Sequence, residues 1–219
     1  MEDISKKTDD TKGRLIEAAG EVFAHHGFRS ATVREICSRA GANVAAVNYH
    51  FRDKEGLYVA VLEHSLQSAT RKYPPDLGLR DQATPEEKLR TFIHSFLLRI
   101  LGEGVPAWHG KLMAREIADP TDALGRVVQS SIRPLHMYLA SILSDLLKEG
   151  KPAEGEERDV IFLCAMSIVG QCLQHFTGRR VIAALRPKSF NPADIERIAD
   201  HITRFSLAGI RGLRAGGSL

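Results

Sequence analysis

The chain has 219 residues, which is enough for a small amino-terminal domain and a larger body with a hydrophobic core of its own. Its hydrophobic content of 43% is ordinary for a soluble globular protein, and its net charge of +3 is too small to indicate nucleic-acid binding by itself. Three cysteines without a CxxC pair, and a start that lacks a signal-peptide pattern, favour a cytoplasmic location.

The amino terminus predicts a tail and then a helix. Residues 1–10 are polar and lack periodicity, so we expect a disordered tail. The first helix should run from about Lys12 to His26 and end at Gly27, after which Phe28 can pack back against the last turn. The adjacent histidines at 25 and 26 point about 100° apart on a helix, so no metal site is expected there.

Two short helices are predicted next. Thr32 can cap a helix over 33–40, with Glu35 reaching back to it in a reciprocal pair. A glycine ends this helix, and Asn43 can cap a second helix over 44–51. Two such helices joined by a short turn with glycine are typical of the helix-turn-helix, whose second helix lies in the major groove of DNA.

The outward residues of this pair have the chemistry of a DNA-binding surface. Small side chains permit close approach, and polar ones can bond to phosphates or base edges. The candidate DNA contacts are Thr32, Arg34, Val44, Ala45, Ala46, Asn48, Tyr49, His50 and Lys54. Thr32, Tyr49 and Lys54 suit phosphates; Arg34, Asn48 and His50 suit base edges. Residues 29–54 also hold five basic residues against two acidic ones, and the alternative is a helical hairpin with no role on DNA.

Residues 12–62 resemble the DNA-binding domain of TetR-type transcriptional regulators. The resemblance is carried by a helix ending AHHGF, followed by ATVREICSRAGANVAAVNYHFRDKEGL. Many members place Tyr where this chain has Asn48, which departs from the pattern. A long fourth helix, Lys54 to about Lys72, spans nearly 30 Å at about 1.5 Å per residue and can join one domain to the next. The DNA-binding domain should therefore cover residues 11–72.

The helical body should cover residues 84–214. A second capping pair, Thr84 with Glu87, opens a helix that runs to about Gly102, and another helix should follow Pro106. A long helical pattern then continues to residue 150 and should kink at Pro134, with both halves facing one core. The fold class is all-α: a helix-turn-helix domain plus a larger helical domain for ligand binding and dimerisation.

Two helices of the body lack a partner for part of their apolar surface. The segment 160–173 is apolar nearly all round and too short to span a bilayer, so no membrane contact is expected. The last helix, capped by Asn191, carries an apolar stripe of heptad-like spacing. We therefore expect a twofold homodimer in which these helices form a four-helix bundle. The alternative is that both stripes form only the core of one chain.

The body, over most of residues 84–213, resembles the CecR-like branch of the TetR-type family. The resemblance rests on the ARE.ADPT run from Ala114 to Thr121, the SIRPL segment and the ending FSLAGIRGL. It implies a repressor whose body holds a small-molecule site. Candidates are polar or soft side chains among apolar ones. They are Trp108, Met113, Arg115, Glu116, His136, Met137, Gln171, His175 and Phe176. For each of them the alternative is an ordinary place in the core.

The functional prediction is a DNA-binding repressor, without cofactor or metal, that a small hydrophobic or amphipathic effector releases from a palindromic operator on double-stranded DNA. A homodimer would set two recognition helices about 34–36 Å apart, so that they read inverted half-sites. A helical adaptor that binds only protein is the first alternative. An enzyme is the second, although the sequence has no GxSxG, phosphate-binding glycine loop, HExxH or zinc spacing.

Overall fold

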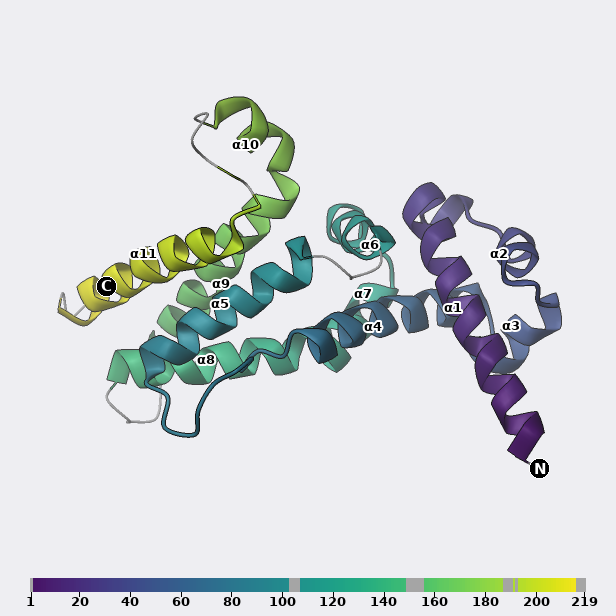
Figure 1. The fold of residues 1–219 in the computed structure, drawn as a ribbon, viewed down its shortest axis with the longest axis horizontal. Coiled ribbons are helices and arrows are strands. Elements are labelled where there is room, and N and C mark those ends of the chain that lie inside the picture. Colours follow the sequence, from purple (N-terminus) through teal and green to yellow (C-terminus); the bar gives the residue numbers. More distant parts are fainter. Residues whose placement is uncertain (1, 103–106, 149–155, 187–190, 192, 216–219) are drawn as a thin grey trace. The chain divides into compact units, whose positions relative to one another are not determined.

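The computed structural model describes residues 2–102, 107–148, 156–186, 191 and 193–215, and the regular structure within these ranges is entirely helical (Figure 1). The all-α prediction is therefore confirmed. The chain divides into two compact units. The first holds residues 1–69 and 104–132, and the second holds residues 70–103 and 133–219.

The first helix is longer than predicted. Helix α1 spans Glu2–Ser30, so the residues expected to form a disordered tail continue the helix. This segment has no proline, and Arg14 pairs with Asp10 one turn earlier, at 3.3 Å from Nε to Oδ2. Gly27, with φ of 79°, interrupts the helix where the sequence predicts its end. Phe28 lies beyond the break with its ring centroid 6.1 Å from that of Phe23, which confirms the predicted contact back to the helix.

Helix α2 spans Val33–Ala40, the predicted range. Its cap forms as expected on one side, because Thr32 Oγ1 accepts a hydrogen bond from the Glu35 amide at 3.2 Å. The returning half of the predicted pair is replaced: Glu35 Oε1 accepts from Arg39 Nη2 at 3.0 Å, since a cation one turn away competes for the carboxylate. Gly41 ends the helix with φ of 59°, a left-handed conformation that favours glycine.

Helices α3 and α4 also end where predicted. Helix α3 spans Val44–Phe51, and Asn43 caps it by accepting from the Ala45 amide at 3.0 Å. Helix α4 spans Lys54–Lys72, and Asp53 Oδ1 accepts from an amide of its first turn at 2.7 Å. The helix-turn-helix geometry thus follows from three local caps.

Three later helices complete the first unit: α6 (Ala107–Ala118), α7 (Ala123–Val127) and the π-helix η1 (Val128–Ile132). The sequence places them in the carboxy-terminal domain, within 84–214, whereas their packing joins them to the helix-turn-helix. The indole of Trp108 explains this, because it lies flat against Gly20 of α1, where an added Cβ would be 2.6 Å from the ring.

The predicted kink at Pro134 takes the form of the π-helix η1, directly before α8 (Arg133–Lys148). Proline has no N–H to donate and its ring clashes with the carbonyl four residues earlier, so the turn before it widens. The sequence predicts that both halves of this helical pattern face one core, and this prediction is wrong. Val127 lies in the core of the first unit, and Leu139 and Ile142 lie in the core of the second.

The second unit is built from α5 (Pro85–Leu101), α8, α9 (Glu156–Thr177), α10 (Arg179–Leu185) and α11 (Ile195–Ala215). Its core contains leucine, isoleucine and phenylalanine side chains from α5, α8, α9 and α11. The capping pair Thr84 and Glu87 forms in full.

The start and the neighbour of the last helix differ from the sequence prediction. Asp194 caps α11 by accepting from the Arg197 amide at 3.1 Å, whereas the predicted cap, Asn191, accepts from the Ala193 amide in the preceding turn at 3.0 Å. Both side chains can cap a helix, and the sequence alone does not tell which one does so. Helix α10 was not predicted.

Candidate functional site

Helix α3 presents a face of small and hydrogen-bonding side chains to solvent. Val47 and Phe51 are buried in the first core, which fixes the orientation of the helix. Val44, Ala45 and Asn48 are exposed, and Tyr49 has 79% of its surface accessible.

Two of the predicted contacts on α3 are only partly accessible. Ala46 packs against the core of the first unit, and His50 is half-buried, with its ring centroid 4.9 Å from that of Tyr49 and 5.9 Å from that of Phe51. Fewer residues of α3 are fully exposed to solvent than the sequence predicts as DNA contacts.

Exposed arginines flank this face. Arg34 on α2 and Arg29 at the end of α1 are exposed, and neither has an acidic group within ion-pair distance in the part of the chain that the structure describes. Arg52, which ends α3 with φ of 74°, has 94% of its side chain accessible. Arg29 and Arg52 were missing from the predicted contacts, although the basic balance of residues 29–54 was the signal for them. Exposed cations on one surface suit a phosphate backbone, and the Arg52 Nε also lies 3.9 Å from Asp53 Oδ2.

Lys54, predicted to contact phosphates, is already bonded within the protein. Its Nζ donates to the carbonyl oxygens of Phe28 at 2.9 Å and Ala31 at 3.0 Å, and it lies 4.7 Å from the centroid of the Phe28 ring. An ammonium that caps the carboxyl end of α1 has less capacity for a phosphate oxygen. The geometry therefore supports a structural role for Lys54.

Buried polar pairs join α6 to α4 inside the first unit. The carboxylate of Glu116 is fully buried, and its Oε2 accepts from the Tyr58 hydroxyl at 2.7 Å. Its Oε1 accepts from the amide and the hydroxyl of Thr121, both at 2.9 Å. A second buried pair joins Ser65 Oγ and His109 Nδ1. Burial raises the pKa of Tyr58 well above its usual value and lowers the pKa of His109 to about 4.

Four of the nine predicted ligand-binding residues, all on α6, belong to this first unit. Glu116 is occupied as above, and Trp108 Nε1 donates to Glu17 Oε2 at 3.3 Å. Arg115 lies against the backbone of Gly27, and Met113 packs on the core. These side chains hold α6 in place. For these four residues the structure therefore favours the alternative, an ordinary place in the core.

The other five lie in the second unit and are dispersed. Met137 is exposed, and the ring of His136 lies 5.7 Å from that of Phe162. Burial and the neighbouring His201 lower the pKa of His175. The Arg179 guanidinium lies 5.4 Å from the ring centroid of Phe176, whereas Gln171 lines a groove between α9 and α11.

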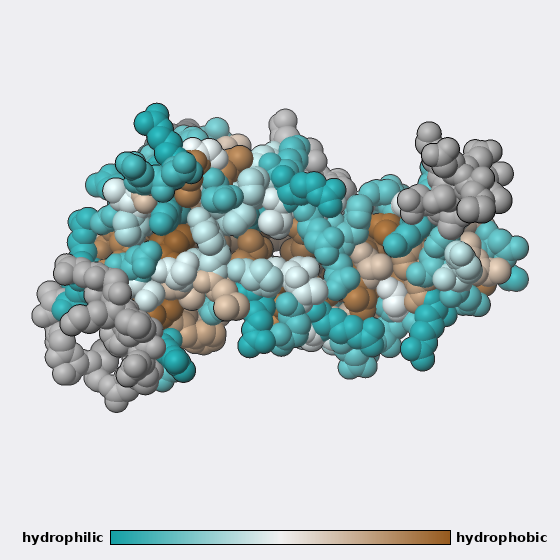
Figure 2. Space-filling view, turned by 90° about the horizontal axis from the view of Figure 1, so that it is seen from below, coloured by the Kyte–Doolittle hydropathy of each residue, from teal (hydrophilic) through white to brown (hydrophobic). Residues whose placement is uncertain are grey.

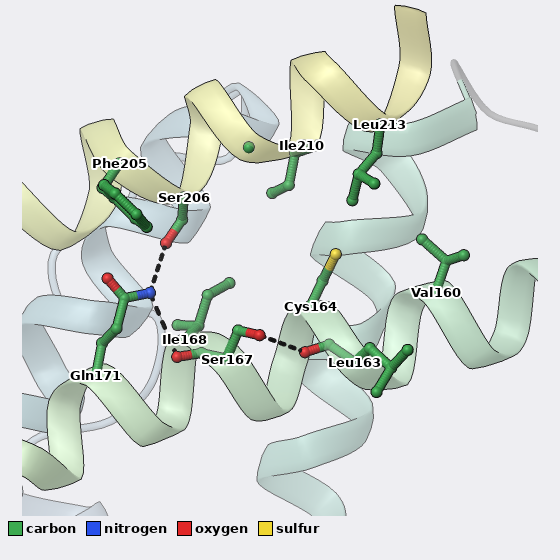
Figure 3. A pocket seen from close by; sticks show the side chains of 11 residues that line it. Val160, Leu163, Cys164, Ser167, Ile168, Gln171, Phe205, Ser206, Ile210 and Leu213 are labelled. Carbon is green, nitrogen blue, oxygen red and sulfur yellow. Dashed lines mark hydrogen bonds between the residues drawn. The ribbon is translucent and has the colours of Figure 1, made fainter. Parts of the chain in front are cut away.

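That groove has a volume of about 300 Å³ and is mostly apolar. In Figure 3, Gln171 Nε2 donates across the groove to Ser206 Oγ, at 3.5 Å. It also donates to the Ser167 carbonyl of its own helix, at 3.3 Å. Large apolar side chains on both helices reach the surface beside it, including Leu163 at 59% and Phe205 at 65% accessible. Apolar residues also reach the surface elsewhere, shown in brown in Figure 2. Both helices thus have an apolar side that one chain leaves uncovered.

Helix α9 is longer than the 14-residue segment predicted from sequence. The span Arg158–Thr177 is long and apolar enough to cross a membrane by length and composition, and 22% of its apolar stretch is buried. The predicted exclusion of a membrane helix by length alone was therefore wrong. Core helices of soluble proteins pass the same test, and α9 packs against α5, α8 and α11.

Comparisons with known proteins agree with both parts of the chain. Residues 15–61 match the family of bacterial regulatory proteins called tetR, and residues 85–210 match the carboxy-terminal domain of the HTH-type transcriptional dual regulator CecR. CecR of Shigella flexneri is 31% identical over 147 residues, which are 63% of this chain and 65% of that protein. The transcriptional repressor NicS of Pseudomonas putida is 27% identical over 219 residues, covering 96% of this chain and 95% of that protein.

A similar fold occurs in the crystal structure of FadR, a transcriptional regulator from Bacillus subtilis, in complex with stearoyl-CoA. The TM-score is 0.64 at 18% identity, and the match covers 90% of this chain and 97% of that one. At this identity the likeness shows the fold alone.

Proposed function

Because this chain belongs to the TetR family of bacterial DNA-binding transcriptional regulators, with a carboxy-terminal domain of the CecR type, we propose that it is a cytoplasmic repressor, released from a palindromic operator by a small hydrophobic or amphipathic effector. The matched families and relatives are transcriptional regulators and not enzymes.

The observation that carries the proposal is the exposed face of α3. Val44, Ala45, Asn48 and Tyr49 face solvent on a helix that Val47 and its neighbours anchor in the core. Small side chains let the helix backbone approach base edges, and the amide of Asn48 can donate and accept at an adenine edge. The exposed arginines beside this face supply the charge for phosphates.

A homodimer is the second element of the proposal. Helix α3 has eight residues, so one copy reads few base pairs, and two copies related by a twofold axis would read an inverted repeat. The apolar sides of α9 and α11, with Leu163 and Phe205 exposed, suit an isologous contact with the same helices of a second copy.

The effector acts by preferring one conformation of the dimer. It must bind more tightly to the shape whose recognition helices do not fit the operator, since equal affinity for both shapes shifts nothing. A coupling free energy of about 1–3 kcal/mol is typical of allosteric proteins in general. The stearoyl-CoA bound to FadR is amphipathic, which fits the proposed effector class.

Fluorescence anisotropy on the DNA upstream of the protein's own gene tests the proposal. We expect Asn48→Ala to weaken specific binding by about 1–3 kcal/mol and to change binding to a random duplex little. Gln67→Ala, which trims an exposed amide on α4, is the matched control and should bind as the wild type does. Failure to prefer the upstream DNA over random DNA would contradict the proposal and favour the protein-binding adaptor.

A further inference from the structure

Arg99 lies inside the second unit with 5% of its surface accessible. Its Nη1 donates to the Tyr73 carbonyl at 2.9 Å and to Ser95 Oγ at 3.0 Å. Its Nη2 is fully buried and has no hydrogen-bond partner. The guanidinium carbon lies 5.9 Å from the ring centroid of Phe92 and 5.4 Å from that of Phe96, so one nitrogen of a buried cation faces apolar surroundings without an acceptor.

No negative charge offsets this guanidinium among the described residues. The one titratable group that raises its pKa is Cys172. Burial raises the pKa of the Cys172 thiol to about 12, so the thiol is neutral at pH 7. Burial lowers the pKa of Arg99 to about 10, so the guanidinium stays protonated at that pH. A buried and uncompensated charge is strongly unfavourable, and proteins normally supply a counter-charge.

A structural role accounts for only half of these contacts. Nη1 fixes the chain that leaves α4, yet the fully buried Ser95 hydroxyl already lies 2.8 Å from the Tyr73 carbonyl and 2.6 Å from that of Pro74. The serine hydroxyl has one hydrogen, so it donates to one of these carbonyls at a time, and none of these bonds uses Nη2. The buried Nη2, which has no acceptor, therefore requires another explanation.

We propose that Arg99 is the anion-binding group of the effector site, and that Nη2 donates to the carboxylate of an amphipathic small molecule. The inference rests on the proposed function, because it names the chemical class of that effector. The apolar part of the molecule would contact the aromatic side chains beside Arg99, as is usual in small-molecule sites.

Charge balance favours a carboxylate over other groups. One carboxylate neutralises one guanidinium, whereas a dianionic phosphate would leave net negative charge in the same buried place. An alcohol or amide could accept a bond from Nη2 but would leave the positive charge uncompensated. A bond between two charged groups is also shorter and stronger than a neutral one.

The test compares carboxylates with amides of the same shape on the full-length protein. The probes are acetate, benzoate and octanoate against acetamide, benzamide and octanamide, followed by thermal unfolding and titration calorimetry. The variants are Arg99→Met and, as a control on the same helix, Arg90→Met, because Arg90 is partly exposed and pairs with Glu196 and Asp200. We expect carboxylates to raise the unfolding temperature of the wild type and of Arg90→Met. In Arg99→Met their affinity should fall about tenfold or more.

Equal stabilisation by carboxylates and amides in the wild type would overturn the assignment, and this comparison holds even if Arg99→Met does not fold. Retention of carboxylate affinity in a folded Arg99→Met would overturn it as well. Operator binding is measured separately. A protein that binds its operator but discriminates no carboxylate contradicts the Arg99 site and leaves the repressor proposal intact. Carboxylates that bind through Arg99 without changing operator affinity contradict release by the effector and leave the site intact.

Discussion

Removing the hydroxyl of Tyr58 would leave the buried Glu116 carboxylate with two donors instead of three. In Tyr58→Phe the ring can keep its contacts with Phe23 and Phe28, at centroid distances of 4.8 and 4.9 Å, so no cavity is created. The lost bond joins a hydroxyl to a charged group, which contributes about 1.5–3 kcal/mol. At about 2–4 °C per kcal/mol for a chain of this size, we expect the unfolding temperature to fall by about 3–12 °C.

Thermal unfolding and urea titration measure this loss, with Tyr138→Phe as the matched control. Tyr138 is half-buried beside Phe92, and its hydroxyl has no hydrogen-bond partner within the described ranges, so this change should cost less than about 0.5 kcal/mol. A double-mutant cycle with Glu116→Gln should show a coupling of at least about 0.5 kcal/mol. Equal losses in the two tyrosine variants, or a coupling of zero, would refute the claim that the hydroxyl stabilises the carboxylate.

Three further changes give separate outcomes. Lys54→Met should lower the free energy of unfolding, measured in urea, by about 1–2 kcal/mol, because the bonds to two carbonyls are lost. It should leave the salt dependence of operator binding unchanged. If the slope of log affinity against log salt concentration were lower by about one, Lys54 would contact a phosphate. Leu163→Asp, on α9, should give a monomer in sedimentation velocity, whereas the control Met137→Asp, on α8, should remain a dimer. If both variants were dimers, the proposed interface through α9 and α11 would be excluded. In the folded chain the pKa of His109 is about 4, whereas in the unfolded chain it is about 6.5. Below pH 6.5 the unfolded chain therefore binds a proton that the folded chain does not bind, and the free energy of unfolding should fall by up to about 3 kcal/mol between pH 6.5 and 4. His109→Asn should reduce that slope, and an unchanged pH profile of unfolding would contradict it.

The helix-turn-helix was predictable because its limits are set by local chemistry. Thr32, Asn43 and Asp53 each accept an amide of the helix that follows, and Gly41 supplies the left-handed turn between two of them. Such bonds span a few residues, so the sequence contains their determinants. Where two candidate caps were close together, as at Asn191 and Asp194, local pattern did not separate them.

The remaining features depend on residues distant in sequence. The ammonium of Lys54 reaches carbonyls 23 and 26 residues earlier, which no pattern within α4 indicates. Helix α6 joins the first unit because Gly20 leaves space for Trp108. No pattern around either residue predicts this contact. Candidate ligand residues chosen by chemical type were therefore divided between two units, while Arg99, a charged residue in an apolar stripe of α5, was overlooked.

The two buried pairs between α4 and α6 share one spacing. Tyr58 and Ser65 are seven residues apart, and so are their partners, Glu116 and His109. Moving α6 along α4 by a single turn would disconnect both pairs together, so that Glu116 would lose its bond from the Tyr58 hydroxyl and the His109 imidazole would lose its bond with Ser65. Intermediate offsets of α6 are consequently penalised as heavily as large ones, and any rearrangement of this helix should behave as an abrupt step between discrete positions.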